Sequence, residues 1–187
     1  MRKMFFIAGL LLLTSGVARA ACDNSQPFEV GGSYDYVRVT SNFLPKSGSG
    51  GSSTSVNLNG WNAEVAANPA CWLGLVGNFA GAYASPQGVS VHVYTETFGP
   101  RINLRNSSPI TPFGEVLIGA AEAGGSAGGR SVSQSAFAGN FGGGVDIDLG
   151  EHWAARARID DIMTHFGSQN QNSLGIAAEI VFKFGKH

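Results

Sequence analysis

The sequence predicts an all-β protein, an eight-stranded antiparallel up-and-down transmembrane β-barrel. Three observations lead to this fold: charged and apolar side chains alternate, the alternating segments are long, and charged residues make up only 13% of the chain, about half the usual share. In WAARARID (153–160), Arg156, Arg158 and Asp160 alternate with Ala157 and Ile159. Successive side chains of a strand point to opposite faces. Such a strand suits a membrane barrel, which turns its apolar face to lipid and its charges inward.

The N-terminus has the three parts of a secretory signal peptide. Arg2 and Lys3 form a basic region, the run FFIAGLLLL (5–13) is apolar, and Ala-Arg-Ala (18–20) supplies a small-x-small cleavage site. The apolar run is too short to cross a bilayer as a helix. We therefore predict that residues 1–20 are a cleaved signal peptide.

The remainder, residues 21–187, is expected to form one outer-membrane β-barrel domain. Cys22 follows the cleavage site, but Arg19 stands three positions before it, where a lipidation signal needs Leu or a similar residue. We therefore expect no lipid anchor. The formal net charge of −1 and the lack of a Lys/Arg cluster give no indication of nucleic-acid binding.

Eight alternating segments are separated by clusters of Gly, Ser, Asn and Pro. In chain order they are 28–40, 54–67, 71–84, 88–99, 112–123, 132–149, 152–164 and 173–185. Tilted by about 45°, segments of this length cross an apolar band of about 25 Å. Strands of soluble proteins are typically about 5–6 residues long. The segment lengths therefore favour the membrane barrel.

Each strand is assigned an apolar face toward lipid and a polar face toward the lumen. The lipid-facing side chains are Trp61, Ala63, Val65, Val91, Val93, Val116, Ile118, Phe141, Val145, Ile147, Leu149, Leu174, Ile176, Ala178, Ile180, Phe182 and Phe184. The lumenal side chains are Asn62, Glu64, His92, Tyr94, Glu96, Glu115, Asn140, Asp146, Asp148, Gly175, Ala177, Glu179, Val181 and Lys183. The third segment alternates poorly and places Trp72 on its inner face.

The orientation of these faces follows from the energetics of charge in a membrane. One Lys or Arg on the lipid face near mid-membrane costs about 2–4 kcal/mol, so Arg156, Arg158 and Lys183 together would cost about 6–12 kcal/mol. That is comparable to the stability of a whole domain. We therefore expect a lumenal salt-bridge network made of Glu64, Glu96, Glu115, Asp146, Asp148, Arg156, Arg158, Asp160, Glu179 and Lys183. The interior of an eight-stranded barrel is just wide enough for its own side chains, which favours a plugged lumen over a channel.

The connections are expected to alternate between long external loops and short periplasmic turns. With the N-terminus in the periplasm, the external loops are 41–53, 124–131 and 165–172. The connection 100–111 is long although it falls on the periplasmic side. Because Pro100 cannot donate a ladder hydrogen bond, we expect a strand end or a bulge at Gly99-Pro100.

Cys22 and Cys71 both fall at the periplasmic end of the predicted barrel. The periplasm is oxidising, and two cysteines there are usually paired. We predict a disulfide between them, closing a loop of about 50 residues and contributing about 4 kcal/mol in the chain-entropy model. It would act as a staple and not as a redox centre.

No cofactor or metal is expected. Asp146, Asp148, Asp160 and Asp161 lack the glycine and the spacing of a calcium loop, and the four histidines have no spacing typical of a metal site. His165 and Ser168, in THFGSQNQNS (164–173), could resemble the His and Ser of a lipid A deacylase, but their surroundings are typical of a polar loop.

The stretches NLNGWNAEVA (57–66), CWLGLVGNFAGAY (71–83), FGPRI (98–102), PFGEVLIGAA (112–121) and GIAAEIVFKFG (175–185) carry a family resemblance. In their order and spacing, the chain resembles the small outer-membrane β-barrel family that includes the transmembrane domain of outer membrane protein A. The resemblance covers residues 27–185 and implies an eight-stranded antiparallel barrel. Such barrels usually finish on an aromatic residue, whereas here Gly185, Lys186 and His187 follow Phe184.

These observations together predict a non-enzymatic, monomeric protein of the outer membrane of a Gram-negative bacterium. Its expected role is structural, or binding and adhesion through the external loops. Its expected partners are outer-membrane lipid and lipopolysaccharide, the barrel assembly machinery during biogenesis, and an extracellular ligand of the loops. A small porin is the alternative, and a lipid A-modifying enzyme that uses His165 and Ser168 is a third hypothesis.

Overall fold

The protein is a closed antiparallel barrel of eight strands, in which each strand pairs with its neighbours in chain order. The computed structural model describes residues 26–41, 54–85, 90–105, 107–127, 130–166 and 169–185. The strands are β1 (Phe28–Ser41), β2 (Thr54–Ala70), β3 (Leu73–Ala84), β4 (Ser90–Asn103), β5 (Ile110–Ala127), β6 (Arg130–Asp148), β7 (Trp153–Phe166) and β8 (Gln169–Phe184). The eight-stranded fold predicted from the alternating segments is confirmed.

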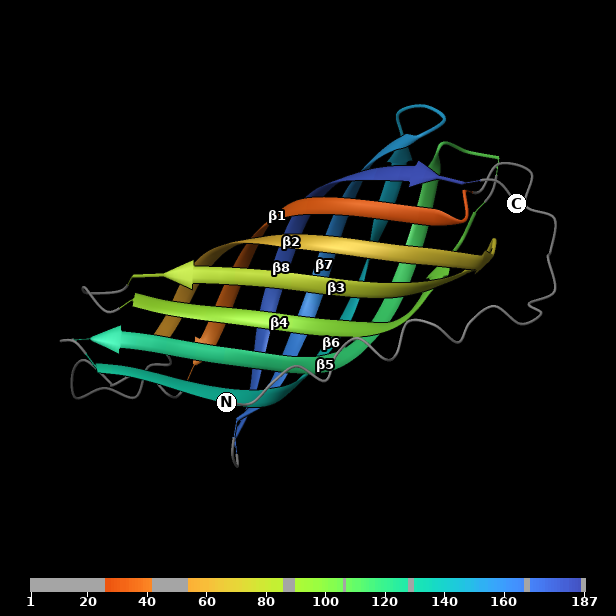
Figure 1. Ribbon diagram of the computed structural model, residues 1–187. Helices are drawn as coiled ribbons and strands as arrows, with labels where there is room; N and C mark the ends of the chain where they lie inside the picture. The colour runs from red at the N-terminus through yellow and green to blue at the C-terminus, as the bar shows by residue number, and fades with distance from the viewer. Residues whose placement is uncertain are drawn as a thin grey trace.

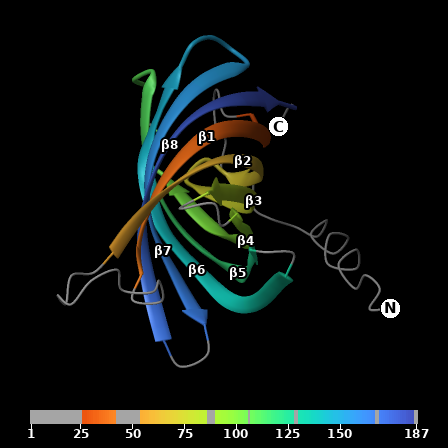
Figure 2. The same cartoon turned by 90° about the vertical axis from the view of Figure 1, so that its left-hand side faces the viewer.

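The barrel closes where β8 pairs with β1. The paired residues run from Phe28 and Phe184 at one end to Val39 and Ser173 near the other. Figure 2 shows this seam, with β8 and β1 side by side. Closure leaves neither strand with an unpaired edge, which a sheet in a membrane cannot tolerate. No helix among the described residues is long and apolar enough to cross a membrane.

The two ends of the barrel carry different connections, and we name them after the turns and loops that the sequence predicts there. The short-turn end, at the right of Figure 1, carries the β2–β3, β4–β5 and β6–β7 connections and the start of β1. The loop end carries the connections from β1 to β2, β3 to β4, β5 to β6 and β7 to β8. Two of the predicted external loops are only partly described. Residues 42–53 and 167–168 lie outside the described residues, and residues 165–166 and 169–171 have no described side chain. The long external loops predicted at 124–131 and 165–172 are wrong, because most of their residues continue the strands β5, β6, β7 and β8.

The strand end or bulge predicted at Gly99-Pro100 is wrong. β4 continues through Pro100 to Asn103, and its register with β5 is the same on both sides of the proline. A Cβ at Gly99 would come within 2.0 Å of the Val116 carbonyl oxygen, so glycine permits a close approach of the two strands there. The register of β2 does shift, between Ala67 and Ala70.

The two faces of the wall follow the predicted alternation in β2, β5, β6 and β8. The lumen holds charged and polar side chains, and large apolar side chains cover the outside. The apolar core is correspondingly small, a cluster of Ala66, Val76 and Leu117. Trp72, predicted to face inward, instead lies in the β2–β3 turn and is exposed, because β3 begins only at Leu73.

In β4 the predicted faces are inverted. Glu96 is exposed on the outer wall together with Tyr94, whereas Thr97 is buried in the lumen. Arg101 explains the inversion, because it shares the face of Thr97 and is almost fully buried. Turning the strand to bring Glu96 inward would carry the Arg101 guanidinium onto the lipid-facing side.

Candidate functional site: the charged lumen

The predicted lumenal charges are distributed over three places. Inside the barrel, the structure brings together Glu64, Glu115, Asp146, Arg156, Arg158, Asp160 and Glu179. Lys183 and Asp148 form a separate ion pair near the short-turn end, with 2.6 Å between Nζ and Oδ1. Glu96 takes no part, because it lies on the outer wall.

Arg156 on β7 is the most highly connected cation. Its Nε donates to Asp146 Oδ1 at 2.6 Å and its Nη2 to Asp146 Oδ2 at 2.9 Å, a bidentate pair. The same Nη2 donates to Glu29 Oε2 at 2.9 Å, and Nη1 donates to Glu64 Oε1. One guanidinium therefore links β6, β1 and β2 across the lumen.

Arg101 on β4 is a second centre, which the sequence reasoning missed. Its Nη2 donates to Glu64 Oε2 at 2.6 Å and to Glu115 Oε2 at 2.5 Å, and its Nε donates to Glu115 Oε2 at 2.8 Å. The guanidinium carbons of Arg101 and Arg156 lie 4.7 and 4.9 Å from the centre of the Phe113 ring. An aromatic face at this distance attracts a cation, so Phe113 supports both arginines.

Glu64 on β2 accepts hydrogen bonds from three arginines. Besides Arg101 and Arg156, Arg158 Nη1 donates to its Oε2 at 3.1 Å. Arg158 also donates from Nε to Asp160 Oδ2 at 2.7 Å. Glu64 is the common acceptor that joins the three guanidiniums into one network, which we call the lumenal network.

Glu29 extends the lumenal network to the short-turn end, and it too was missed. Its Oε1 accepts from Asn68 Nδ2 at 2.9 Å and from Arg105 Nη2 at 3.0 Å. Arg105 Nε also donates to the Cys71 carbonyl at 3.1 Å. The signal was present in the sequence, because FEVGGSYD places Glu29 and Asp35 on one face of a strand.

Glu179 on β8 is the loosest member. Its two carboxylate oxygens lie 3.9 Å from Arg156 Nη1 and from Arg158 Nη1, and neither oxygen has a hydrogen-bond partner among the described residues. A Cβ at Gly31, on the neighbouring strand β1, would come within 1.8 Å of Glu179 Oε1. The missing side chain of Gly31 therefore makes room for this carboxylate.

The other candidate residues do not form a site in the described chain. Among the residues that the structure describes, no three His, Cys, Asp or Glu side chains converge to hold a metal ion. Asp160 and Asp161 point to opposite faces of β7, the first buried and the second exposed. His165 is part of β7, and its predicted partner Ser168 lies outside the described residues.

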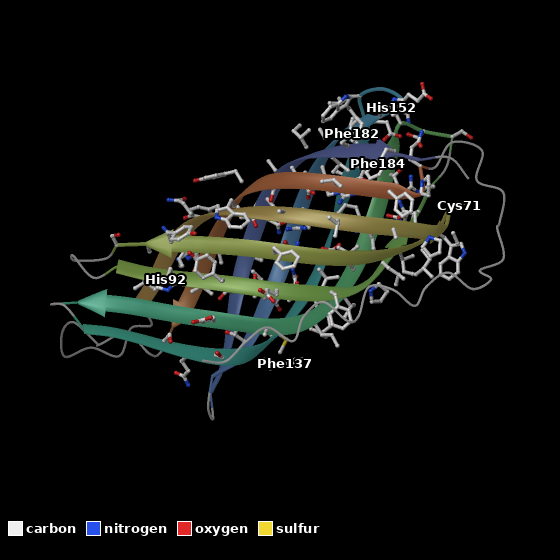
Figure 3. All side chains as sticks on the ribbon, in the orientation of Figure 1. Cys71, His92, Phe137, His152, Phe182 and Phe184 are labelled. Carbon is white, nitrogen blue, oxygen red and sulfur yellow. The ribbon has the colours of Figure 1, made fainter. Side chains whose placement is uncertain are left out.

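The predicted disulfide involves a residue outside the described chain. Cys71 lies in the turn between β2 and β3, at the short-turn end where Figure 3 labels it. Cys22 lies outside the described residues. Pro27, one of the first described residues, lies near the end of β2, because Asn68 N donates to its carbonyl oxygen at 2.7 Å.

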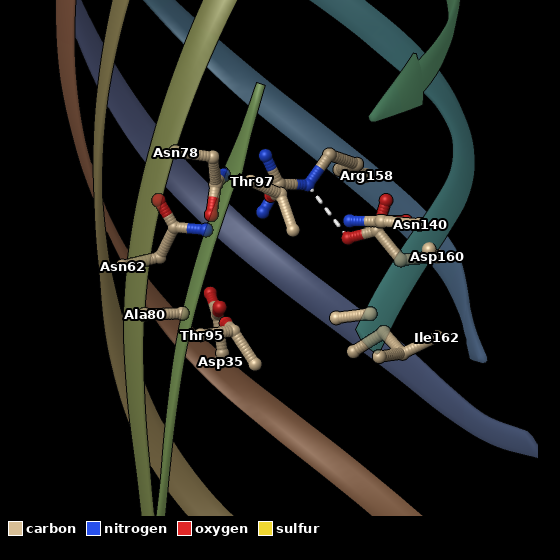
Figure 4. A pocket seen from close by; sticks show the side chains of 12 residues that line it. Asp35, Asn62, Asn78, Ala80, Thr95, Thr97, Asn140, Arg158, Asp160 and Ile162 are labelled. Carbon is tan, nitrogen blue, oxygen red and sulfur yellow. Dashed lines mark hydrogen bonds and ion pairs between the residues drawn. The ribbon is translucent and has the colours of Figure 1, made fainter. Parts of the chain in front are cut away.

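Among the described residues, the ion-paired side chains of the lumen are drawn from seven of the eight strands. Beyond the lumenal network, toward the loop end, a small polar cavity remains (Figure 4). Buried ion pairs stabilise a fold only when each buried charge has a partner.

The comparisons with known proteins agree with this architecture. The family model "Outer membrane protein beta-barrel domain" matches residues 7–184. No curated protein has a significant sequence match to the chain. Neisserial surface protein A (NspA) is similar in structure, with a TM-score of 0.72 at 13% identity over 85% of this chain and 98% of NspA.

Two further solved structures share the fold. Ail, the attachment invasion locus protein of Yersinia pestis, has a TM-score of 0.59 at 17% identity, over 84% of this chain and 99% of Ail. The N-terminal β-barrel domain of Pseudomonas aeruginosa OprF has a TM-score of 0.52 at 12% identity, over 84% of this chain and 98% of that domain. Because the family model spans every strand of the barrel, the chain belongs to the family of outer membrane protein β-barrel domains.

Proposed function

We propose that this chain is a non-enzymatic protein of the Gram-negative outer membrane that acts through its loop end, in a structural or a binding and adhesion role. The observation that carries the proposal is the lumenal network centred on Glu64, Arg101 and Arg156. A lumen occupied by paired charges leaves the outer wall and the loops as the surfaces that can meet other molecules.

Two aromatic groups on the outer wall support a position across a bilayer. Near the short-turn end, Phe182 stacks on Phe184 with ring centres 5.9 Å apart and contacts Trp153 with ring centres 4.8 Å apart. Toward the loop end, Tyr83 and Tyr94 meet edge to face at 5.9 Å. Aromatic side chains gather at both interfaces of a membrane, so these two groups fit the two surfaces of the bilayer.

In this orientation the short-turn end faces the periplasm and the loop end faces the outside of the cell. The signal peptide predicted in residues 1–20 would export the chain, and the barrel assembly machinery would insert it as a monomer. Lipopolysaccharide would then surround the wall near the loop end. The external loops predicted from the sequence would then be the part of the chain that meets the medium.

Binding or adhesion has support from a relative of known structure. Ail is described as an attachment invasion locus protein, and one of its structures is a complex with the heparin analogue sucrose octasulfate, with a TM-score of 0.58 to this chain. Since that relationship shows the fold alone, we carry over only the idea that an external surface of such a barrel meets a ligand.

The test compares cells or vesicles that carry the intact chain with those that carry a variant in which 42–53 is replaced by a short Gly/Ser turn. We expect the intact chain to bind a host-cell or glycan surface and the variant to lose that binding while its barrel still folds. Equal binding by both proteins would remove the first loop from the proposal, and no binding by either would favour the purely structural role.

A further inference from the structure

The tyrosines of the chain lie on one side of the barrel. All four are exposed on the outer wall of β1, β3 and β4, as Tyr34, Tyr36, Tyr83 and Tyr94. These strands lie side by side with β2 and β5 on the wall nearest the viewer in Figure 1. The sequences of β6, β7 and β8 contain no tyrosine, and their outer wall carries Phe137, Met163 and Leu174 toward the loop end. A girdle that only anchors a barrel at the membrane surface surrounds it, so the one-sided distribution indicates a further role.

Five rings from β1 to β4 form a group that we call the aromatic patch, made of Tyr34, Trp61, Tyr83, His92 and Tyr94. Tyr34 lies opposite Trp61 in the β1–β2 register. The Tyr94 ring lies 5.9 Å from the Tyr83 ring and 5.5 Å from the His92 ring, between centres. Trp61, Tyr83 and Tyr94 are between 42% and 44% exposed, and Figure 3 shows His92 near the loop end. The patch is therefore an open aromatic surface.

Two glycines seat these rings against the wall. Gly81 lies between Trp61 and Tyr94 in the register, and a Cβ there would come within 2.9 Å of Trp61 Nε1 and 3.2 Å of Tyr94 Cε1. A Cβ at Gly124 would collide with the His92 ring. The rings take the space that these side chains would fill, so the backbone itself sets their arrangement. A surface arranged in advance loses little conformational entropy when a ligand binds.

The charge around the aromatic patch is negative. Glu122 lies opposite Tyr94 in the β4–β5 register, Glu96 lies two residues from Tyr94 on the same face, and both carboxylates are exposed. In the sequences of β2, β3, β4 and β5 the only Lys or Arg is Arg101, which is buried in the lumen. Phosphate and sulfate groups would be repelled by these carboxylates. The patch therefore fits an uncharged ligand.

The aromatic patch stands where the outer wall changes from apolar to polar. Along the outer face of β2 the residues toward the loop end are Val65, Ala63, Trp61, Asn59 and Asn57. Trp61 is thus the last apolar side chain of this face among the described ones. In the orientation proposed above, this border lies at the headgroups of the outer leaflet, and the inference rests on that orientation.

We propose that the aromatic patch binds the uncharged sugar headgroup of a glycolipid in the outer leaflet. The C–H bonds on one face of a sugar ring carry partial positive charge and are attracted by the negative face of an aromatic ring. The hydroxyls of the sugar donate to Glu96 and Glu122, whose ionised carboxylates can only accept. The Tyr94 hydroxyl accepts from Tyr83 at 3.1 Å and can still donate to a sugar oxygen.

The test uses the full mature chain, labelled with ¹⁵N, folded in phosphatidylcholine nanodiscs and observed by NMR. Maltosyl diacylglycerol, whose headgroup is an uncharged sugar, replaces a rising fraction of the phosphatidylcholine, and phosphatidylglycerol does so in a parallel series. We expect the indole N–H signal of Trp61 to shift and saturate with the maltosyl lipid and not with phosphatidylglycerol. Trp153 at the short-turn end is the internal control, and its indole signal should show no saturable shift. Galactosyl diacylglycerol tests a second sugar.

Matched variants locate the site on the aromatic patch. Tyr94→Leu removes a ring and keeps the wall apolar, so we expect the lipid fraction at half-saturation to rise roughly three- to tenfold. Phe137→Leu makes a comparable change on the other side of the barrel and should titrate like the wild-type protein. Glu122→Gln should weaken binding as well, whereas Asp161→Asn, also on the outer wall, should not.

The outcomes separate a sugar site from a simple membrane anchor. The proposal is overturned if neither sugar lipid gives a saturable shift of Trp61, or if phosphatidylglycerol gives an equal one. It is also overturned if folded Tyr94→Leu and Glu122→Gln both titrate like the wild-type protein. The variant in which 42–53 is replaced should titrate normally, so a failure of loop binding and a failure of sugar binding are distinct results.

Discussion

Arg101 on β4 donates a hydrogen bond of 2.6 Å to Glu64 on β2, across a lumen in which β3 lies between these two strands along the wall. The contact joins strands that share no ladder hydrogen bonds. Backbone pairing holds each strand to its neighbours, whereas this ion pair holds together two strands that are separated by a third. The lumenal network therefore supplies cross-lumen contacts that an apolar core supplies in a soluble domain.

The first prediction concerns Glu64, the acceptor shared by three arginines. Glu64→Gln removes the negative charge and leaves Arg101, Arg156 and Arg158 with fewer partners. Removing one partner from a buried ion pair typically costs about 3–5 kcal/mol, so we expect a loss of unfolding free energy of that size. Urea unfolding in lipid vesicles, followed by the gel mobility of unheated samples, measures it.

Glu96→Gln is the matched control, because Glu96 has the same side chain on the outer wall. Its replacement touches no member of the lumenal network and should leave the stability unchanged or raise it. Equal destabilisation by the two substitutions would contradict the central role of Glu64.

Sequence alternation predicts which residues share a face, but not always which face is inside. In β8, Glu179 and Lys183 set the orientation by their charge. In β4 the predicted segment ends at Gly99, so it excludes Arg101, the residue that sets the orientation. Glu96 is then the only charge in the predicted segment, and it indicates the inverted orientation of the strand.

The ion-pair partners of a lumenal residue are harder to predict from the sequence than the face of the strand on which it lies. Alternation is a local property of one strand, whereas Arg156 pairs with carboxylates on β1, β2 and β6. Those pairings depend on the tilt and stagger of all eight strands. The sequence therefore indicates that Arg156 is central, and only the closed barrel shows that Glu29 is among its partners.

The second prediction tests the space that Gly31 leaves for Glu179. In Gly31→Ala the new Cβ would lie 1.8 Å from Glu179 Oε1, so the carboxylate must move. Overpacking typically costs about 1–3 kcal/mol, and because only the end of a flexible side chain must move, we expect a cost at the lower end of that range. In Gly32→Ala the nearest atom is the Asn62 carbonyl oxygen at 3.9 Å, so we expect a neutral or slightly stabilising change. Paired urea unfolding curves check both, and a Gly32→Ala loss as large as that of Gly31→Ala would be evidence against the contact.

The third prediction concerns the disulfide proposed between Cys22 and Cys71. The two residues would close a loop of about 50 residues, so Cys71→Ser should lower the unfolding free energy by about 4 kcal/mol in the chain-entropy model. Dithiothreitol should destabilise the wild-type protein by a similar amount and leave Cys71→Ser unaffected. Mass spectrometry of non-reduced peptides identifies the linkage directly, and two free thiols would disprove it.

The last prediction decides between a plugged lumen and the alternative, a small pore. In planar bilayers we expect the wild-type protein to show little steady conductance. The double variant Arg156→Ser/Asp146→Ser removes a bidentate ion pair without changing the net charge. The shorter side chains leave space in the lumen between Glu64 and the strands β6 and β7. If the lumenal network closes the barrel, steady conductance should appear in this variant.

The control for this experiment is Asp161→Ser, which changes a neighbouring carboxylate on the outer wall and should stay silent. Two outcomes separate the hypotheses, since both depend on the space that the lumen leaves for ions. Conductance in the double variant alone supports the plug. Conductance of equal size in the wild-type protein and the variant means that ions already pass beside the paired charges. In that case the small pore becomes the function that the structure supports, and the loops become its mouth.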